Sequence, residues 1–408
     1  MPADAIEAQP QMRADIIQGP VRPGTAEFAG LTAARCRLSP PSPVTPSVTS
    51  SILQTMLAVL TLRLRAGTAL AMLAMLCGPS AAMAQPQHLL HVTYEPTYEL
   101  FAELNELFVG HRAQMHGQEV VIDMSHAPSA VQTRKVDEGD LAADVVTLVN
   151  RFDLEYIVGS SGRISSSWVS ALPDSASPFA SPVVFLVRAG NPHAIRDWLD
   201  LTGRSGLNIV STNPLISGFG RYAYIGIYHQ ARQVFGEDDN RVFGMLLDFY
   251  RSHEIIYPSS DEAVEAFIGA GRGDVLLAWE HRALQALREH PGLFELIIPA
   301  ATLMPKPRVA VVEANARSHG TLELATDYTR FMFSDAAQEV MVRHGFRPAS
   351  TRVRRRHEGE FAAITSLPLQ LYGPQSGFFQ THFGLEGWYE RIQRRMTADR
   401  AREARAAP

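Results

Sequence analysis

Apolar and polar positions follow two alternating patterns from about residue 88 onward. Short apolar runs, such as 143–148 (ADVVTL) and 274–278 (DVLLA), are typical of strands buried in a parallel sheet. Between such runs, apolar residues recur three or four positions apart, which is the spacing of a helix. The predicted strands are 88–93, 119–123, 143–148, 183–187, 208–210, 254–257, 274–278, 294–298 and 308–312. The predicted helices are 97–109, 130–138, 220–235, 241–252, 261–270, 283–290, 322–333 and 335–344.

This alternation predicts an α/β fold, with mostly parallel sheets covered by helices on both faces. Because the chain is longer than one such sheet needs, two lobes are favoured. The segments 183–187 (VVFLV) and 308–312 (RVAVV) have Pro182 and Pro305 nearby, and we expect them to be paired strands that cross between the lobes as a hinge. Lobe one is then expected from 85–182 and 305–408, and lobe two from 183–304.

The first 84 residues predict a leader instead of a folded domain. Residues 1–50 are rich in Pro, Ala, Ser and Thr and lack periodicity, which is typical of disorder. The apolar run 66–77 follows two arginines and precedes Ala-Met-Ala at 82–84, so we expect a secretory signal peptide cleaved after Ala84. The run is shorter than the roughly 20 residues of a membrane span. Signal peptides are rarely this long, which favours a true start near Met56.

Composition narrows the class of protein. The chain has 408 residues, 46% of them hydrophobic, and a net charge of -5, which disfavours wholesale disorder and nucleic-acid binding. Its only cysteines, Cys36 and Cys77, exclude disulfide scaffolds, Cys-rich zinc sites and iron–sulfur clusters. Both precede the expected cleavage, and a thiol-free exported chain suits an oxidising compartment. No metal and no cofactor is expected.

Catalytic signatures are missing from the sequence. There is no G-x-S-x-G elbow, no P-loop and no H-E-x-x-H. Ser125 and His126 are adjacent, and neighbours on an extended backbone point apart, which disfavours a catalytic dyad. We therefore expect no enzyme and no catalytic residue, and an exported hydrolase is the least favoured hypothesis.

Three loops suggest anion binding. Each lies between a predicted strand and a predicted helix: 125–129 (SHAPS), 213–220 (NPLISGFG) and 257–260 (YPSS). The start of a helix carries free N–H donors and a partial positive charge, and ligands of open α/β sheets bind at the carboxyl ends of strands. Ordinary N-capping by the serines is the alternative for any one loop. Three such loops in an exported two-lobe chain favour an anion site.

Six motifs follow one another along the chain: VTYEPTYELF at 92–101, VVIDMSHAPSAVQ at 120–132, ADVVTL at 143–148, GRISSSWVSALPDSASPFASPVVFLVRAGNP at 162–192, NPLISGFGRYAY at 213–224 and GRGDVLLAWE at 271–280. With them, residues 88–395 resemble the periplasmic sulfate-binding proteins of ABC importers, the sulfate/thiosulfate family. The resemblance implies a type II periplasmic-binding-protein fold, in which two α/β lobes joined by a two-strand hinge close on a dehydrated oxyanion. It implies a periplasmic, monomeric receptor, with ABC permease subunits of the inner membrane as partners.

In that family the anion is held without a countercharge, by backbone N–H groups, a few hydroxyls and one indole N–H. Carried over by position, the first-loop serine is Ser129, the Ser-Gly-Gly run is Ser217, Gly218 and Phe219, the third-loop donor is Ser260, the indole is Trp279 and the acidic residue is Glu95. An indole N–H is only a donor, so Trp279 suits an unprotonated oxyanion. Core packing is the alternative for Trp279.

Three positions depart from the family pattern. Pro128 removes one N–H from the first loop, and Phe219 replaces a flexible glycine. Asp261 stands where an arginine is usual, so it adds negative charge beside the anion, unless it only starts helix 261–270 and points to solvent. The ligand therefore stays open between sulfate or thiosulfate, another oxyanion such as molybdate, and a small organic anion.

Overall fold

The computed structural model describes residues 86–368 and 375–406, and the predicted leader lies outside these residues. Four strands form the first sheet, in the order β10-β3-β1-β2. β1 runs parallel to β2 and β3, whereas β10 is antiparallel to β3. The bounds are β1 Gln87–Tyr94, β2 Val120–Ala127, β3 Val145–Leu148 and β10 Arg308–Val311.

Five strands form the second sheet, in the order β7-β6-β8-β5-β9. β6 is parallel to β7 and β8, and β5 is antiparallel to β8 and β9. The α/β class is thus confirmed, although the second sheet is more mixed than expected because β5 enters it from the opposite end. The bounds are β5 Val183–Arg188, β6 Ile209–Thr212, β7 Ile256–Tyr257, β8 Val275–Trp279 and β9 Phe294–Ile297.

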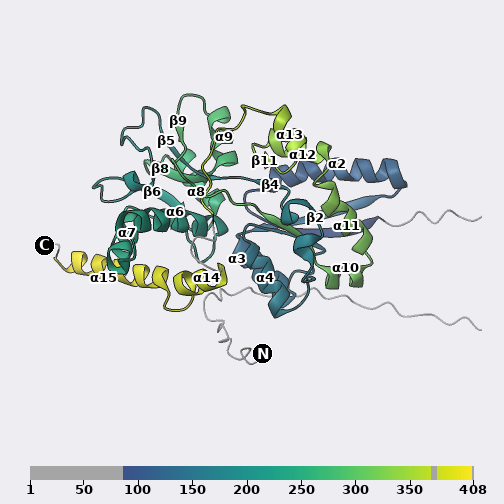
Figure 1. The fold of residues 1–408 in the computed structure, drawn as a ribbon, viewed down its shortest axis with the longest axis horizontal. Helices are drawn as coiled ribbons and strands as arrows, with labels where there is room; N and C mark the ends of the chain where they lie inside the picture. Colours follow the sequence, from purple (N-terminus) through teal and green to yellow (C-terminus); the bar gives the residue numbers. More distant parts are fainter. Residues whose placement is uncertain (1–85, 369–374, 407–408) are drawn as a thin grey trace, which may run out of the picture. The chain divides into compact units, whose positions relative to one another are not determined.

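Helices cover both sheets (Figure 1). The predicted helix 97–109 extends to His116, where Gly117 ends it in a left-handed conformation with φ 62°. The helix at Arg151–Ser160 was not predicted. The bounds are α2 Tyr98–His116, α3 Ser129–Glu138, α4 Arg151–Ser160, α5 Pro173–Ala176, α6 Gly218–Phe235, α7 Asp239–Arg251, α8 Ser260–Ile268, α9 Glu280–Glu289, α10 Glu313–His319, α11 Leu322–Phe331, α12 Asp335–Arg343, α13 Thr351–Arg356, α14 Gln375–Phe383 and α15 Trp388–Ala406. In the described residues, no helix is long and apolar enough to span a membrane.

The two sheets are joined by extended segments held together by backbone hydrogen bonds. Ser181 N donates to Pro305 O at 3.2 Å, and Val183 N donates to Leu303 O at 3.0 Å. The predicted pairing of 183–187 with 308–312 is wrong, because β5 pairs with β8 and β9 whereas β10 pairs with β3. The crossing segments pair at the start of β5 and before β10, and the two strands then diverge into separate sheets.

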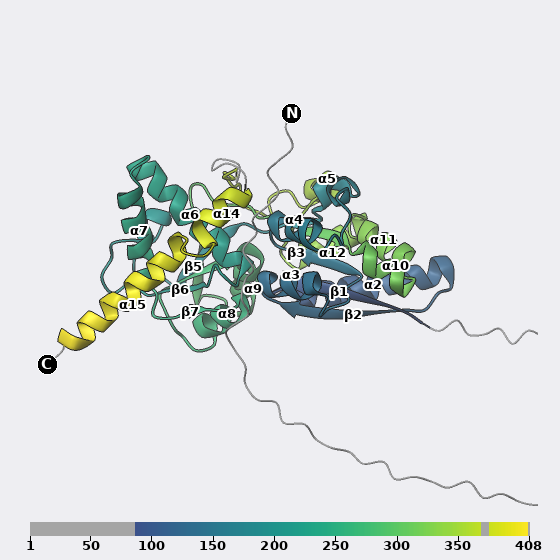
Figure 2. The same ribbon diagram turned by 90° about the horizontal axis from the view of Figure 1, so that it is seen from below.

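A third segment crosses beside the first two. Thr302 N donates to Thr365 O at 3.0 Å, and Leu367 N donates to Thr302 O at 2.8 Å. Beyond it, α15 contacts α7, and Phe378 of α14 and Trp388 of α15 pack edge-on against Tyr228 of α6; both views draw these helices side by side (Figures 1 and 2). Tyr389 of α15, fully buried, packs edge-on against Tyr250 of α7. The predicted lobe boundaries stay a prediction, but these two helices, which it gave to lobe one, pack against helices of the second sheet.

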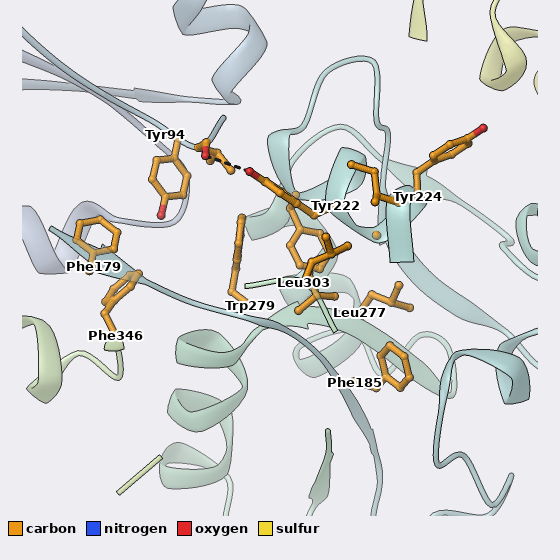
Figure 3. Close-up of a cluster of buried hydrophobic side chains, with 14 of the residues drawn as sticks. Tyr94, Phe179, Phe185, Tyr222, Tyr224, Leu277, Trp279, Leu303 and Phe346 are labelled. Atoms are coloured by element: carbon orange, nitrogen blue, oxygen red, sulfur yellow. Dashed lines mark hydrogen bonds between the residues drawn. The ribbon is translucent and has the colours of Figure 1, made fainter. Parts of the chain in front are cut away.

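Large aromatic side chains form the core at the joint between the sheets. Trp279, at the end of β8, lies between Tyr94 of β1 and Tyr222 of α6 (Figure 3). Their ring centroids are 6.1 and 6.4 Å from that of Trp279, and all three side chains are at most 3% exposed. The joint is therefore packed by residues of both sheets.

Candidate functional site

The predicted site residues lie where strands of both sheets end. Parallel strands β1, β2 and β3 end at one edge of the first sheet, and the loops that follow lead to Glu95, to α3 and to α4. In the second sheet, β6, β7 and β8 lead to α6, α8 and α9. Each of the three predicted segments thus leads into a helix, as expected. The first is shorter than predicted, because residues 125–127 belong to β2 and only Pro128 separates that strand from α3.

The first loop is anchored through Ser129, the first residue of α3. This buried side chain donates a hydrogen bond from Oγ to Asp153 Oδ2 at 2.8 Å and accepts one from Val149 N at 3.3 Å. The other oxygen of Asp153 pairs with Arg221 of α6 at 2.8 Å. The hydroxyl of Ser129 is thus part of a buried network that joins α3, α4 and α6.

The second loop contacts the end of β3. Ser217 caps α6, since its Oγ accepts from Gly220 N at 3.4 Å. A Cβ on Gly218 would lie 2.9 Å from Val149 Cβ, so only glycine lets α6 approach this closely. Phe219 lies edge-on to Trp279 with centroids 4.9 Å apart. Its buried ring fills space beside the indole, as the sequence suggested.

Within the described part of the chain, Trp279 carries a buried donor without an acceptor. The residue is 1% exposed, and among the described residues its Nε1 has no hydrogen-bond partner. An unsatisfied buried N–H costs about 1–3 kcal/mol, so such groups in native proteins usually meet a ligand or water. The indole therefore both packs in the core and offers a donor.

The third loop lies beside the Glu95 carboxyl and leads into Asp261. Ser260 is the first residue of α8, and Ser259 caps it by accepting from Glu262 N at 3.1 Å. Burial, followed by the nearby Asp261 carboxylate, raises the pKa of Glu95 from 4.5 to about 7, although hydrogen bonds from Ser259 and Ser260 act in the opposite direction. The Asp261 carboxylate therefore acts on Glu95, and the expectation that both face one cleft stays a prediction.

Asp261 is not simply a solvated start of a helix. Its side chain is half-exposed and forms an ion pair with Arg282 Nη2 at 3.3 Å. Burial raises the pKa of Asp261, while the Arg282 guanidinium lowers it. The extra negative charge at this loop is therefore partly neutralised by a cation of α9.

The seven predicted residues form one continuous region. Ser129 and Gly218 both approach Val149, Phe219 contacts Trp279, Trp279 packs near Tyr94, and Glu95 follows Tyr94 toward Ser260. Sequence reasoning missed Asp153 and Arg221, because α4 was not predicted and no motif marks a buried ion pair. Among the described residues, no group of three His, Cys, Asp or Glu side chains could hold a metal.

The hydrolase hypothesis finds no geometric support in the first loop. Gln132 Nε2 donates to Ser125 Oγ at 3.2 Å and to Ser125 O at 2.9 Å, which fixes that residue to α3. Burial lowers the pKa of His126 to about 4. A histidine this weakly basic is poorly matched to general-base catalysis near neutral pH.

Comparisons with known proteins agree with this geometry. Residues 83–347 match the family model described as "Bacterial extracellular solute-binding protein". The chain is 33% identical to the sulfate-binding protein of Escherichia coli K12 over 325 residues, 79% of this chain and 98% of the relative. It is 30% identical to the thiosulfate-binding protein of Pseudomonas aeruginosa over 317 residues, 77% and 94% of the two chains. The solved sulfate-binding protein SubI from Mycobacterium tuberculosis H37Rv is similar with a TM-score of 0.61 and 27% identity, covering 69% of this chain and 93% of that one.

Proposed function

Since this chain belongs to the bacterial extracellular solute-binding proteins, we propose that it is the receptor of an ABC importer and binds sulfate or thiosulfate. The type II fold and the binding-protein class expected from the sequence are thereby confirmed, and the chain is not an enzyme. In this proposal it delivers the anion to permease subunits in the inner membrane. It acts as a monomer in the periplasm, after cleavage near Ala84.

One observation supports an oxyanion as the class of ligand. Among the described residues, Trp279 is a buried donor without an acceptor, it directly precedes α9, and its ring packs against Phe219 in the first turn of α6. Backbone N–H groups of Ser129, Gly218, Phe219 and Ser260, together with the Ser217 hydroxyl, are proposed to complete the donor set. Such a set suits a fully ionised oxyanion, because it offers donors and demands no acceptor. Glu95 is proposed to limit the site on the α8 side.

The three departures bear on which oxyanion is bound. Pro128 caps α3 without any side-chain hydrogen bond, and Phe219 occupies space that a glycine would leave. Asp261 is paired with Arg282, so its charge is less costly than the sequence suggested. Sulfate and thiosulfate stay the first candidates, and the space filled by Phe219 favours a small anion over a larger organic acid.

The two lobes are proposed to follow the two sheets. Residues 85–182 and the segment from 305 through α13 would form lobe one, and residues 183–304 would form lobe two. Contacts of α14 and α15 with α6 and α7 support adding these helices to lobe two. The hydrogen bonds at 181–183 and 303–305 would then mark the hinge.

Calorimetry tests the function directly. The chain from residue 85 to 408 is unfolded and refolded to remove carried-over anion, then titrated with sulfate, thiosulfate, molybdate and phosphate. We expect one site per chain and the highest affinity for sulfate or thiosulfate, with a matching rise in melting temperature. Binding of molybdate alone, or of none of the four anions, would overturn the proposed ligand.

A further inference from the structure

Arg308 lies at the same edge as the candidate site, although no predicted loop contains it. It is the first residue of β10, and it pairs with Leu148 at the end of β3. Because β10 runs antiparallel to β3, its start lies where the parallel strands end. Arg308 is therefore a neighbour of Val149, which Ser129 and Gly218 also approach.

The guanidinium of Arg308 is left without a polar partner at two of its nitrogens. Among the described residues, Nε and Nη1 are buried and make no hydrogen bond. Other cations around the joint have carboxylate partners: Arg221 pairs with Asp153, Arg282 with Asp261, and Lys306 with Asp174. Burial lowers the pKa of Arg308, which reflects the cost of desolvating this charge.

Tyr222 connects this cation with the indole. The Tyr222 hydroxyl donates to Val149 O at 3.5 Å, and its ring packs near Trp279 (Figure 3). The charge of Arg308 opposes the rise that burial causes in the pKa of Tyr222, so the guanidinium lies close to that hydroxyl. The Tyr222 side chain thus lies between two sets of buried donors that have no acceptor among the described residues, the Trp279 N–H and the Arg308 N–H groups.

We propose that Arg308 supplies a positive charge to the bound anion, donating from Nε or Nη1, and sets a preference for dianions over monoanions. This proposal rests on the proposed function. With Arg308 as a donor, the site differs from one that holds its anion by neutral donors alone. A formal cation offsets the negative charge that Glu95 and Asp261 bring to the opposite side. It also gives the unpaired guanidinium an acceptor when the anion is present.

The test compares sulfate with perchlorate, a tetrahedral monoanion, by calorimetry on refolded 85–408. Arg308→Gln removes the charge, Arg308→Met is a second neutral variant, and Arg308→Lys keeps the charge. We expect each neutral variant to weaken sulfate binding about tenfold to a hundredfold and perchlorate binding much less. Arg308→Lys should keep most of the preference for sulfate. The matched control is Arg151→Gln, because Arg151 is a nearby, half-exposed cation already paired with Glu155, and it should change affinity less than about threefold.

The outcomes separate this inference from the function itself. Wild-type protein that binds neither sulfate nor thiosulfate overturns the proposed function. Wild-type binding with an unchanged sulfate-to-perchlorate ratio in a folded neutral variant overturns only the role of Arg308. Melting curves without anion identify which neutral variant folds, and either one decides the question.

Discussion

The starts of α6 and α8 differ in their electrostatic surroundings although they are built alike. Each helix follows a strand of the second sheet, and each is capped by a serine, Ser217 or Ser259, that accepts from a backbone N–H three residues on. The start of α6 adjoins the Trp279 indole and the neutralised pair of Asp153 and Arg221. The start of α8 instead carries the Asp261 carboxylate in its first turn and lies beside the carboxyl of Glu95.

This contrast shows that a helix dipole alone does not define an anion site. Both helix starts carry the same partial positive charge, but a carboxylate of the protein already faces the N–H groups of α8. An incoming dianion meets donors at α6 and negative charge at α8. We therefore expect α6 to provide most of the affinity and α8 to make that affinity depend on pH.

The largest expected effect comes from the buried pair that holds α6 against α4. Asp153→Ala leaves Arg221 without its carboxylate partner. Because the Arg221 side chain is only 13% exposed, water cannot fully replace that partner. Removing one partner of a buried pair costs about 3–5 kcal/mol, so the free energy of unfolding should fall by that amount. Urea denaturation followed by circular dichroism measures it. Glu155→Ala, which breaks an exposed pair on the same helix, is the control and should cost at most about 1 kcal/mol. Equal losses in the two variants would contradict a special role for Asp153.

The next effect concerns the donor on the α6 side. Trp279→Phe keeps most of the ring but removes the N–H, and a hydrogen bond to a charged group contributes about 1.5–3 kcal/mol. Sulfate affinity should fall about tenfold to a hundredfold in calorimetry. Trp198→Phe is a matched control, because Trp198 is equally buried but donates to Ala301 O at 3.1 Å. If Trp279→Phe binds sulfate like the wild type, the indole is core packing only and the contrast between the two helices is lost.

The elements were predictable where local pattern decides structure. Apolar runs at 143–148 and 274–278 became the buried strands β3 and β8, because such runs fit a sheet covered on both faces. The helix α4 was missed because its apolar residues, Leu154 and Ile157 among them, are few within a short segment. Pro182 and Pro305 led to the prediction of a crossing at 183–187 and 308–312, whose lobe boundaries stay a prediction. The partners of β5 and β10 depend on long-range packing, which local pattern does not encode.

The sequence predicted which residues belong to the candidate site, but it did not predict the partners of their side chains. Motifs identified Trp279 and the three loops, and the structure packs Phe219 of the second loop against Trp279, while their role in binding stays a prediction. Electrostatic partners were not predictable, because Asp261 meets Arg282 of another helix and Ser129 meets Asp153 of an unpredicted one. Arg308 lies within a predicted strand as one polar residue before an apolar run, and nothing in that pattern reveals unused buried donors.

A moderate effect should appear on the α8 side as a dependence on pH. The raised pKa of Glu95, about 7, means that this carboxyl is mostly ionised at pH 8 and mostly protonated at pH 5. Sulfate affinity should therefore rise as pH falls through about 7, by less than about tenfold because the carboxyl is only partly buried. The nearby His126, with its pKa lowered to about 4, stays neutral across this range.

Glu95→Gln removes the titrating group and should give an affinity nearly constant between pH 5 and pH 8. Calorimetry in matched buffers at these two values measures the change for both proteins. Glu99→Gln, an exposed carboxylate on the first turn of α2, is the control and should keep the pH dependence. A wild-type affinity that does not vary with pH would show that Glu95 lies too far from the anion to affect it.

The smallest effect is expected at Asp261, the carboxylate in the first turn of α8. Its side chain is 50% exposed and already paired with Arg282, so solvent and the guanidinium both weaken its repulsion of an anion. Asp261→Ala at pH 8 should raise sulfate affinity less than about threefold, and less than Glu95→Gln does. The double variant Asp261→Ala/Arg282→Ala, which also removes the neutralising cation, should return affinity toward the wild-type value. A rise of tenfold or more in Asp261→Ala would mean that Arg282 does not neutralise this charge, and that Asp261 instead of Glu95 dominates the α8 side.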